Sequence, residues 1–218
     1  MPKRKEIFTE NAYYHVFNRG VEKRIIFLDD QDYQTFIDIL TYYLKFVKKS
    51  FLNALGRIGL THTGLFQDKI TLVAYCLMPN HFHLLVHQKE ANATTKFMHR
   101  IGVTYSQYFN KRYQRAGPLF QGRFKAKYLD TDPYLLQTSK YIHRNPLTLT
   151  RPGRVVNVWS SYKQFVDPSI KLTQIDKLVD PLPVLNNFSK TNPQLSYKSF
   201  VEETDLADWY KQELKWLR

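Results

Sequence analysis

Two strand-like segments separated by only two residues constrain the fold of this chain more than any other feature. The segments read ITLVAYCLM (residues 70–78) and HFHLLVHQ (residues 81–88), and Pro79 and Asn80 lie between them. Proline and asparagine favour turns, so this short connection predicts an antiparallel hairpin. The sequence therefore indicates an antiparallel sheet.

Further strands and helices are predicted on either side of this hairpin. The segment AYYHVFNRG (residues 12–20) alternates as a strand does, and residues 29–49 have helical apolar spacing, with acids at the start and lysines at the end. We expect a second helix from about Thr94 to Tyr113, a strand over residues 124–130 and a third helix over residues 131–145, before a proline. This order predicts an α+β sandwich in which helices cover the sheet.

The character of the sequence changes from Leu147 onward. Prolines recur there, and residues 155–218 contain eight basic and eight acidic residues, which gives no net charge. Short amphipathic pieces such as YKSFVEETDLADWYKQELKWL predict helices. We therefore expect a main domain over residues 1–150 and a mostly helical C-terminal extension over residues 151–218, packed on the main domain or beside it.

The composition is that of a folded protein, with 43% hydrophobic residues in a chain of 218. The single cysteine, Cys76, excludes an internal disulfide bond and a zinc site built from cysteines. No apolar run is long enough to span a membrane, and the first residues, MPKRKEIFTEN, lack the apolar stretch of a signal peptide. We therefore expect a cytoplasmic protein with no membrane partner.

The formal net charge of +13 is concentrated in one part of the chain. Residues 96–154 contain 12 Lys and Arg against two acids, whereas residues 1–95 contain 12 against nine. Within the basic stretch, residues 105–129 interleave aromatic side chains with Lys and Arg and contain no acid. Phosphate neutralisation combined with base stacking needs this mixture, so the stretch indicates nucleic acid as the partner. The alternative is a solvated basic face whose aromatic side chains pack inward.

The second strand of the hairpin carries two histidines on one face. Side chains alternate along a strand, so His81 and His83 should point out together. The apolar side chains of the opposite face would fill the core; they are Phe82, Leu84 and Val86. Neutral imidazoles are common metal ligands, and two on a rigid strand form a preformed pair of donors. Because such a pair can also be structural or incidental, the metal hypothesis needs an independent partner.

A tyrosine and an asparagine in the third predicted helix are candidates for that partner. Within YIHRNP, Tyr141 and Asn145 lie about one turn apart on one helical face. The amide oxygen of Asn145 can bind a hard divalent cation, and the phenol of Tyr141 can attack a phosphorus atom that the cation polarises. Alternatively, the tyrosine is an ordinary core or surface residue and Asn145 only ends the helix. Tyr134 is a rival nucleophile, but Thr138 rather than an amide lies four residues after it.

The segments PNHFHLLV, GPLFQGRFKAKYL and YIHRNPL, in this order and spacing, resemble the single-tyrosine HUH transposases and, among them, the REP-associated tyrosine transposases. The likeness extends from about Tyr13 to Pro168 and includes YHVFNRGVEKRIIF and WSSYKQF. This resemblance implies a ferredoxin-like or RRM-like sandwich with the two histidines on a central strand. Residues 1–150 would then be the catalytic domain of a metal-dependent transposase.

The same resemblance implies the roles of the candidate site residues. His81, His83 and Asn145 would bind a divalent metal, Mg²⁺ or Mn²⁺, with substrate or water completing the shell. Tyr141 would attack a phosphate of single-stranded or hairpin DNA, which leaves a covalent 5′-phosphotyrosine and a free 3′-hydroxyl. The reverse step would rejoin the strand without ATP, so the enzyme would be an endonuclease and a strand transferase.

The basic stretch supplies the expected DNA contacts. Arg123 and Lys125 are the first candidates for phosphate binding. Further residues expected to touch DNA are Lys111, Arg112, Arg115, Tyr108 and Phe120. Two other functions stay open: an inactive single-stranded nucleic-acid-binding module without metal, and a metal nuclease that uses water as its nucleophile. Residues 49–69 could be an extra DNA-binding loop or a disordered arm, and a homodimer is compatible with the sequence.

Overall fold

Four strands form one antiparallel sheet in the order β2-β3-β1-β4. The computed structural model describes residues 7–45, 64–147, 159–167, 178–203 and 205–213. The strands are β1 (Ala12–Arg19), β2 (Ile70–Met78), β3 (His81–Gln88) and β4 (Lys125–Leu129). The predicted hairpin is confirmed, because β2 and β3 pair antiparallel across the two-residue turn.

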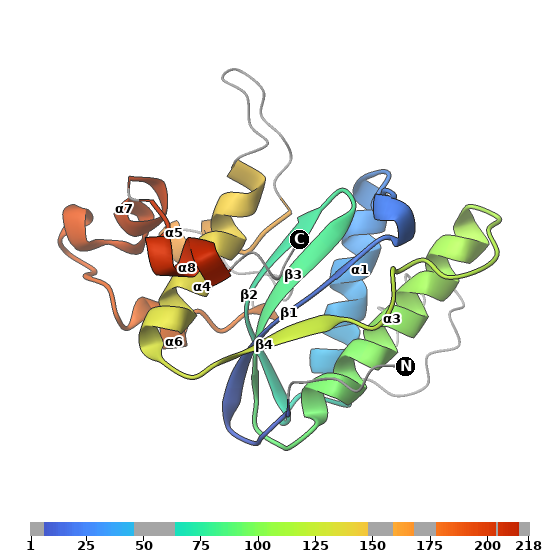
Figure 1. The fold of residues 1–218 in the computed structure, drawn as a ribbon, viewed down its shortest axis with the longest axis horizontal. Helices are drawn as coiled ribbons and strands as arrows, with labels where there is room; N and C mark the ends of the chain where they lie inside the picture. The colour runs from blue at the N-terminus through green and yellow to red at the C-terminus, as the bar shows by residue number, and fades with distance from the viewer. Residues whose placement is uncertain (1–6, 46–63, 148–158, 168–177, 204, 214–218) are drawn as a thin grey trace.

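Helices cover both faces of the sheet (Figure 1). α1 (Asp30–Leu44) and α3 (Ala93–Arg112) pack on one face, and α4 (Asp132–Leu147) packs on the other. This arrangement confirms the predicted α+β sandwich, and β1 and β3 occupy the centre of the sheet as in a ferredoxin-like fold. Among the described residues, no helix is both long enough and apolar enough to cross a membrane.

The ends of two helices differ from the prediction. α4 was expected to end at Asn145, because a residue before proline disfavours helical geometry, but the helix includes Pro146. The proline stands in the last turn, where its missing N–H removes a single hydrogen bond, so the helix can accommodate it. α1 ends at Leu44, earlier than expected. Residues 46–63 lie outside the described residues, and they include most of the segment 49–69 that the sequence predicts to be irregular.

Two hydrophobic cores lie on opposite faces of the sheet. The first core, under α1 and α3, contains the side chains predicted for it; they are Phe82, Leu84 and Val86. The second core lies between the other face, α4 and the C-terminal segment. His81 and His83 do share this second face, but the expectation that both point out to solvent is wrong for His83, which is only 3% exposed. The helix α4 covers this face of the sheet, and the alternation of side chains along a strand carries no information about such a cover.

The described part of the C-terminal segment is mostly helical, as expected, and packs on α4 and on the edge strand β2 (Figure 1). Its helices are α5 (Tyr162–Val166), α6 (Leu182–Leu185), α7 (Tyr197–Glu202) and α8 (Asp208–Glu213). The Ser161 amide donates to the Tyr75 carbonyl of β2 at 3.1 Å. On α4, the Lys140 ammonium donates to the Asp205 carbonyl at 2.6 Å. The predicted boundary near residue 150 lies outside the described residues.

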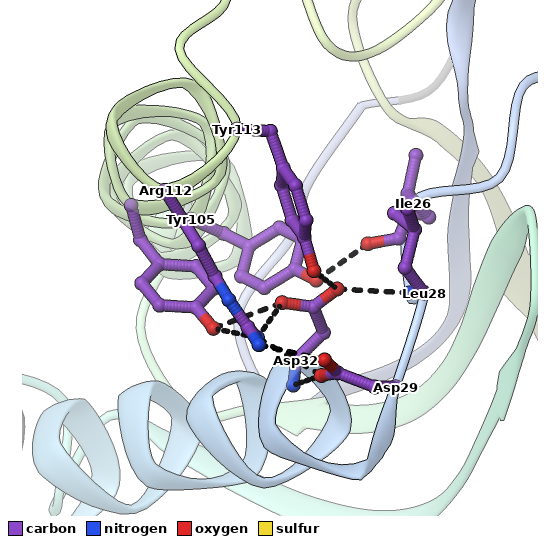
Figure 2. A network of polar contacts seen from close by, with 8 residues as sticks. Ile26, Leu28, Asp29, Asp32, Tyr105, Arg112 and Tyr113 are labelled. Atoms are coloured by element: carbon purple, nitrogen blue, oxygen red, sulfur yellow. Dashed lines mark hydrogen bonds and ion pairs between the residues drawn. The ribbon is translucent and has the colours of Figure 1, made fainter.

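A buried carboxylate joins the start of α1 to the end of α3 (Figure 2). Asp32 is fully buried, and its two oxygens accept four side-chain or backbone hydrogen bonds. The donors are the Leu28 amide (2.8 Å), the Tyr108 hydroxyl (2.9 Å), the Tyr113 hydroxyl (2.8 Å) and the Arg112 guanidinium (2.7 Å). The same guanidinium makes a bidentate ion pair with Asp29, the N-cap residue of α1. The network therefore links the two helices that cover the first core.

We expect Asp32→Asn to lower the free energy of unfolding by roughly 2–4 kcal/mol, because it removes the charge that Arg112 faces and puts an NH₂ group among donors. Asp38→Asn on the same helix is the matched control, since Asp38 is half-buried and bonds the neighbouring Gln34. It should cost less than about 1 kcal/mol. Urea denaturation measures both values, and equal losses in the two variants would show that the network adds no stability of its own.

Candidate active site

A pocket of about 640 Å³ opens between the sheet and the C-terminal half of α4. Its residues come from β1 and the turn after it, from β3, from the segment around the start of β4, and from α4. They are Phe17, Asn18, Arg19, Lys23, His81, His83, Gln121, Gly122, Arg123, Lys125, Tyr141 and Asn145. The pocket thus brings together six of the residues singled out in the sequence, from segments that are far apart in the chain.

Strand register explains why the polar residues meet on one face. Residues directly opposite in neighbouring strands point to the same side of a sheet. Arg19 lies opposite His81, and Phe17 lies opposite both His83 on β3 and Lys125 on β4. The second face of the sheet therefore carries imidazoles and cations at the end of β1 where α4 leaves room for a pocket.

The orientation of the His81 ring is fixed by the turn residue before it. The Nδ1 atom of His81 is 2.7 Å from the Asn80 side-chain oxygen, and the Asn80 amide nitrogen donates to the Lys23 carbonyl at 3.1 Å. Because the amide oxygen can only accept, His81 carries its hydrogen on Nδ1. Burial and the nearby charge of Arg19 lower the pKa of His81 to about 4. The neutral ring therefore has its lone pair on Nε2.

His83 is the most enclosed of the pocket residues. Its ring centroid lies 5.0 Å from that of His81, and the two planes are almost perpendicular. Burial, with the neighbouring histidines and Arg19, holds the pKa of His83 well below its usual value. The Nδ1 atom lies 2.9 Å from Nε2 of His15, whereas the buried Nε2 atom has no hydrogen-bond partner. A buried ring nitrogen without a partner needs an explanation, and a ligand of the pocket would supply one.

Tyr141 and Asn145 face the histidines from one side of α4. The Tyr141 ring meets His83 edge-on, with centroids 5.3 Å apart. The Asn145 side-chain nitrogen donates to the Tyr141 carbonyl at 2.8 Å, a bond that does not involve the amide oxygen. Burial raises the pKa of the Tyr141 phenol, while a hydrogen bond with Asn145 and the charge of Arg19 act in the opposite direction. The phenol is thus protonated at neutral pH in the protein alone.

The donor set of the pocket fits a divalent cation. Among the described residues, no three side chains of the His, Cys, Asp or Glu types come together as a complete metal cage. The pocket side chains that could bind such a cation are the imidazoles of His81 and His83, each through a neutral ring nitrogen, and Asn145 through its amide oxygen. A set of two or three protein ligands leaves positions for a substrate, which is characteristic of catalytic rather than structural metal sites.

Four cationic side chains line the same pocket as this donor set. Arg123 and Lys125 were predicted as phosphate contacts, and the structure places both at the pocket. Arg19 and Lys23 line it as well, although the sequence reasoning missed them. The segment NRGVEKR contains both, but only the pairing of β1 with β3 reveals that Arg19 stands beside His81. A phosphate in this pocket would meet positive charge on several sides.

The other predicted DNA contacts lie outside the pocket. Arg112 belongs to the Asp32 network (Figure 2), and the Tyr108 hydroxyl donates to the same carboxylate. The Arg115 guanidinium donates to the Asn110 side chain at 2.6 Å, and Lys111 is exposed near the end of α3. Phe120 and Arg123 line a neighbouring, largely apolar groove of about 1160 Å³ along α3, which shares Asn18 and Gly122 with the pocket.

Tyr134, the rival nucleophile, does not line the pocket. Its ring packs against Trp209 of the C-terminal segment, with centroids 4.7 Å apart. Tyr141 carries the one hydroxyl group among the described side chains that line the pocket. His87, on the same face of β3 as the two pocket histidines, instead stacks on Tyr13 at 4.5 Å. Geometry therefore separates both residues from the candidate site.

Comparisons with known proteins agree with this architecture. A family model described as IS200-like transposase matches residues 8–145. Among solved structures, a REP-associated tyrosine transposase bound to a REP hairpin aligns with a TM-score of 0.52 and 15% identity, over 83% of this chain and 93% of that one. This likeness concerns the fold. A bacterial tRNA(His) guanylyltransferase-like protein in complex with ATP aligns only at a TM-score of 0.38 and 9% identity, over 66% and 62% of the chains. A search of curated proteins found no significant match.

Proposed function

Because this chain belongs to the family of IS200-like transposases, which carries out DNA cleavage and strand transfer, we propose that it cleaves and rejoins single-stranded DNA through a covalent bond to Tyr141. The observation that carries this proposal is the position of the phenol. Tyr141 packs edge-on against His83 inside a pocket that also holds His81 and Asn145. The matched family region, residues 8–145, includes all four.

The pocket residues suggest how the reaction would proceed. A divalent cation bound by His81, His83 and Asn145, either Mg²⁺ or Mn²⁺, would supply charge neutralisation for the phosphate that is cleaved. The phenol oxygen of Tyr141 would form a bond to phosphorus and lose its proton, and the 3′ oxygen of the preceding nucleotide would leave and take up a proton. The product is a 5′-phosphotyrosine that keeps the phosphodiester energy, so the reverse reaction can rejoin a strand.

The cations around the pocket would hold the DNA backbone. Arg19 and Lys23 line the pocket from the end of β1 and the turn after it, and Arg123 and Lys125 line it from the start of β4, so a phosphate there would meet several positive charges. The adjoining groove offers Phe120 and other apolar side chains to unpaired bases. A REP hairpin is the DNA bound by the structural relative, and we propose hairpin DNA as the partner here. The pocket is formed within one chain, so the proposal does not require a homodimer.

The test is to incubate the protein with single-stranded oligonucleotides and Mn²⁺ and to separate the products on a denaturing protein gel. A label at the 3′ end should move with the protein, because the 5′-phosphotyrosine retains that fragment. A label at the 5′ end should appear on a shortened free fragment, and EDTA should suppress both products. Cut DNA without a shifted band would favour the nuclease that uses water, and DNA binding without cutting would favour the inactive binding module.

We expect Arg123→Ala with Lys125→Ala to lower the slope of log affinity against log salt concentration by about 1.4, because each phosphate contact of single-stranded DNA contributes about 0.7. Lys163→Ala with Lys198→Ala is the matched control, since both lysines are exposed on the C-terminal segment and the same charge is removed. Fluorescence anisotropy at several salt concentrations gives the slopes. An equal change in the two double variants would mean that only net charge matters.

A further inference from the structure

His15 is a buried histidine that the reaction proposed above does not use. It lies on the central strand β1 with 1% exposure, and it does not line the pocket. Its Nε2 atom is 2.9 Å from Nδ1 of His83, and the two ring centroids are 5.0 Å apart. His15 thus contacts the Nδ1 atom of His83, a candidate metal ligand. The other ring nitrogen of His83, Nε2, is the buried atom without a hydrogen-bond partner.

The direction of this hydrogen bond decides whether His83 can bind a metal. Both rings are fully enclosed, and burial favours the neutral imidazole, so each ring carries a single N–H hydrogen. If His15 donates, the hydrogen of His83 must sit on Nε2, where it finds no acceptor. If His83 donates from Nδ1, its Nε2 atom carries a lone pair instead.

We propose that His15 is a positioning residue: it accepts the Nδ1 hydrogen of His83 and thereby holds the Nε2 lone pair available to a divalent metal ion. The inference rests on the metal site proposed above. The same arrangement is found at His81, where the Asn80 side-chain oxygen accepts the Nδ1 hydrogen. Both candidate ligands are therefore held in one tautomer by a polar neighbour, a device that orients metal-binding histidines in general.

The test compares two replacements of His15 in the full chain. His15→Phe keeps a flat ring of similar size among aromatic neighbours but has no acceptor. His15→Gln places an amide oxygen close to the position of Nε2 and can still accept. Mn²⁺ affinity is measured by EPR titration without DNA, and the ring nitrogens of His83 are assigned by ¹⁵N NMR of the metal-free protein. His87→Phe serves as control, because His87 lies on the same strand face away from the pocket.

We expect His15→Phe to weaken Mn²⁺ binding by about 10- to 100-fold and His15→Gln to stay within a few-fold of wild type. The NMR spectrum should show hydrogen on Nδ1 of His83 in wild type and in His15→Gln, and a shift toward hydrogen on Nε2 in His15→Phe. Hydrogen on Nε2 in wild type, or wild-type Mn²⁺ affinity in His15→Phe, would overturn the proposal. The spectrum needs no metal, so it decides the bond direction even if wild type binds no Mn²⁺, a result that would count against the proposed function.

Discussion

Tyr141→Phe should form no covalent protein–DNA product and should lose cleavage by at least about 10³-fold, because it removes the only hydroxyl among the described side chains that line the pocket. The ring that packs edge-on against His83 stays in place, so the fold and the pocket should persist. Binding of single-stranded DNA should change by less than a few-fold, since the cations at the pocket are untouched. A denaturing gel with 3′-labelled DNA measures the first effect, and anisotropy measures the second.

Tyr134→Phe is the matched control for this prediction. Tyr134 lies on the same helix, but its ring packs against Trp209 and does not line the pocket. Its loss should leave the shifted band at nearly wild-type intensity. If Tyr141→Phe still yields the band while Tyr134→Phe abolishes it, the nucleophile has been misassigned. If both variants cut DNA as wild type does, neither phenol takes part in the reaction.

Much of the fold could be predicted because it depends on local patterns. The turn residues Pro79 and Asn80 fix the hairpin, and the alternation of Phe82, Leu84 and Val86 fixes the face of β3 that enters the first core. The helix bounds were less accurate. The last turn of α4 includes Pro146, because a proline there removes only a single hydrogen bond. The rule that a helix ends before a proline therefore placed the end of α4 too early.

The burial of the histidine face could not be predicted from β3 alone. Strand alternation places His81 and His83 on one side of the sheet, but whether that side is exposed to solvent depends on which helix covers it. α4 and the C-terminal segment do so, through contacts such as the 2.7 Å bond between His143 and the Tyr197 hydroxyl. This bond joins residues 54 positions apart, beyond the reach of any local pattern.

The same limit applies to individual site residues. The sequence does not identify His15 and Arg19 as site candidates, because their positions beside His83 and His81 depend on the register of β1 against β3. Conversely, Arg112 was singled out for its place in a basic stretch, yet its charge is balanced by Asp29 and Asp32, about 80 residues earlier. A run of basic residues indicates the character of a surface but not which cations are already paired.

His83→Ala should abolish metal-dependent cleavage, with a loss of about 10³-fold or more, and should weaken Mn²⁺ binding by at least about 100-fold. Charge neutralisation by a metal is worth several kcal/mol in such reactions, and His83 would supply one of two imidazole ligands. Because His83 is buried against His15 and Tyr141, alanine also leaves a cavity, so a stability loss of about 1–3 kcal/mol is expected. His83→Leu fills more of that space, has no metal-binding atom and should fold better.

His87→Ala separates the ligand effect from a general effect of removing a histidine from β3. His87 stacks on Tyr13 outside the pocket, so its loss should leave Mn²⁺ affinity and cleavage within a few-fold of wild type. Circular dichroism and thermal unfolding show which variants are folded, and only folded protein enters the comparison. Cleavage by folded His83→Ala or His83→Leu at the wild-type rate in Mn²⁺ would rule out His83 as a metal ligand. Loss of cleavage with unchanged Mn²⁺ affinity would instead assign His83 to the positioning of Tyr141, the ring it touches.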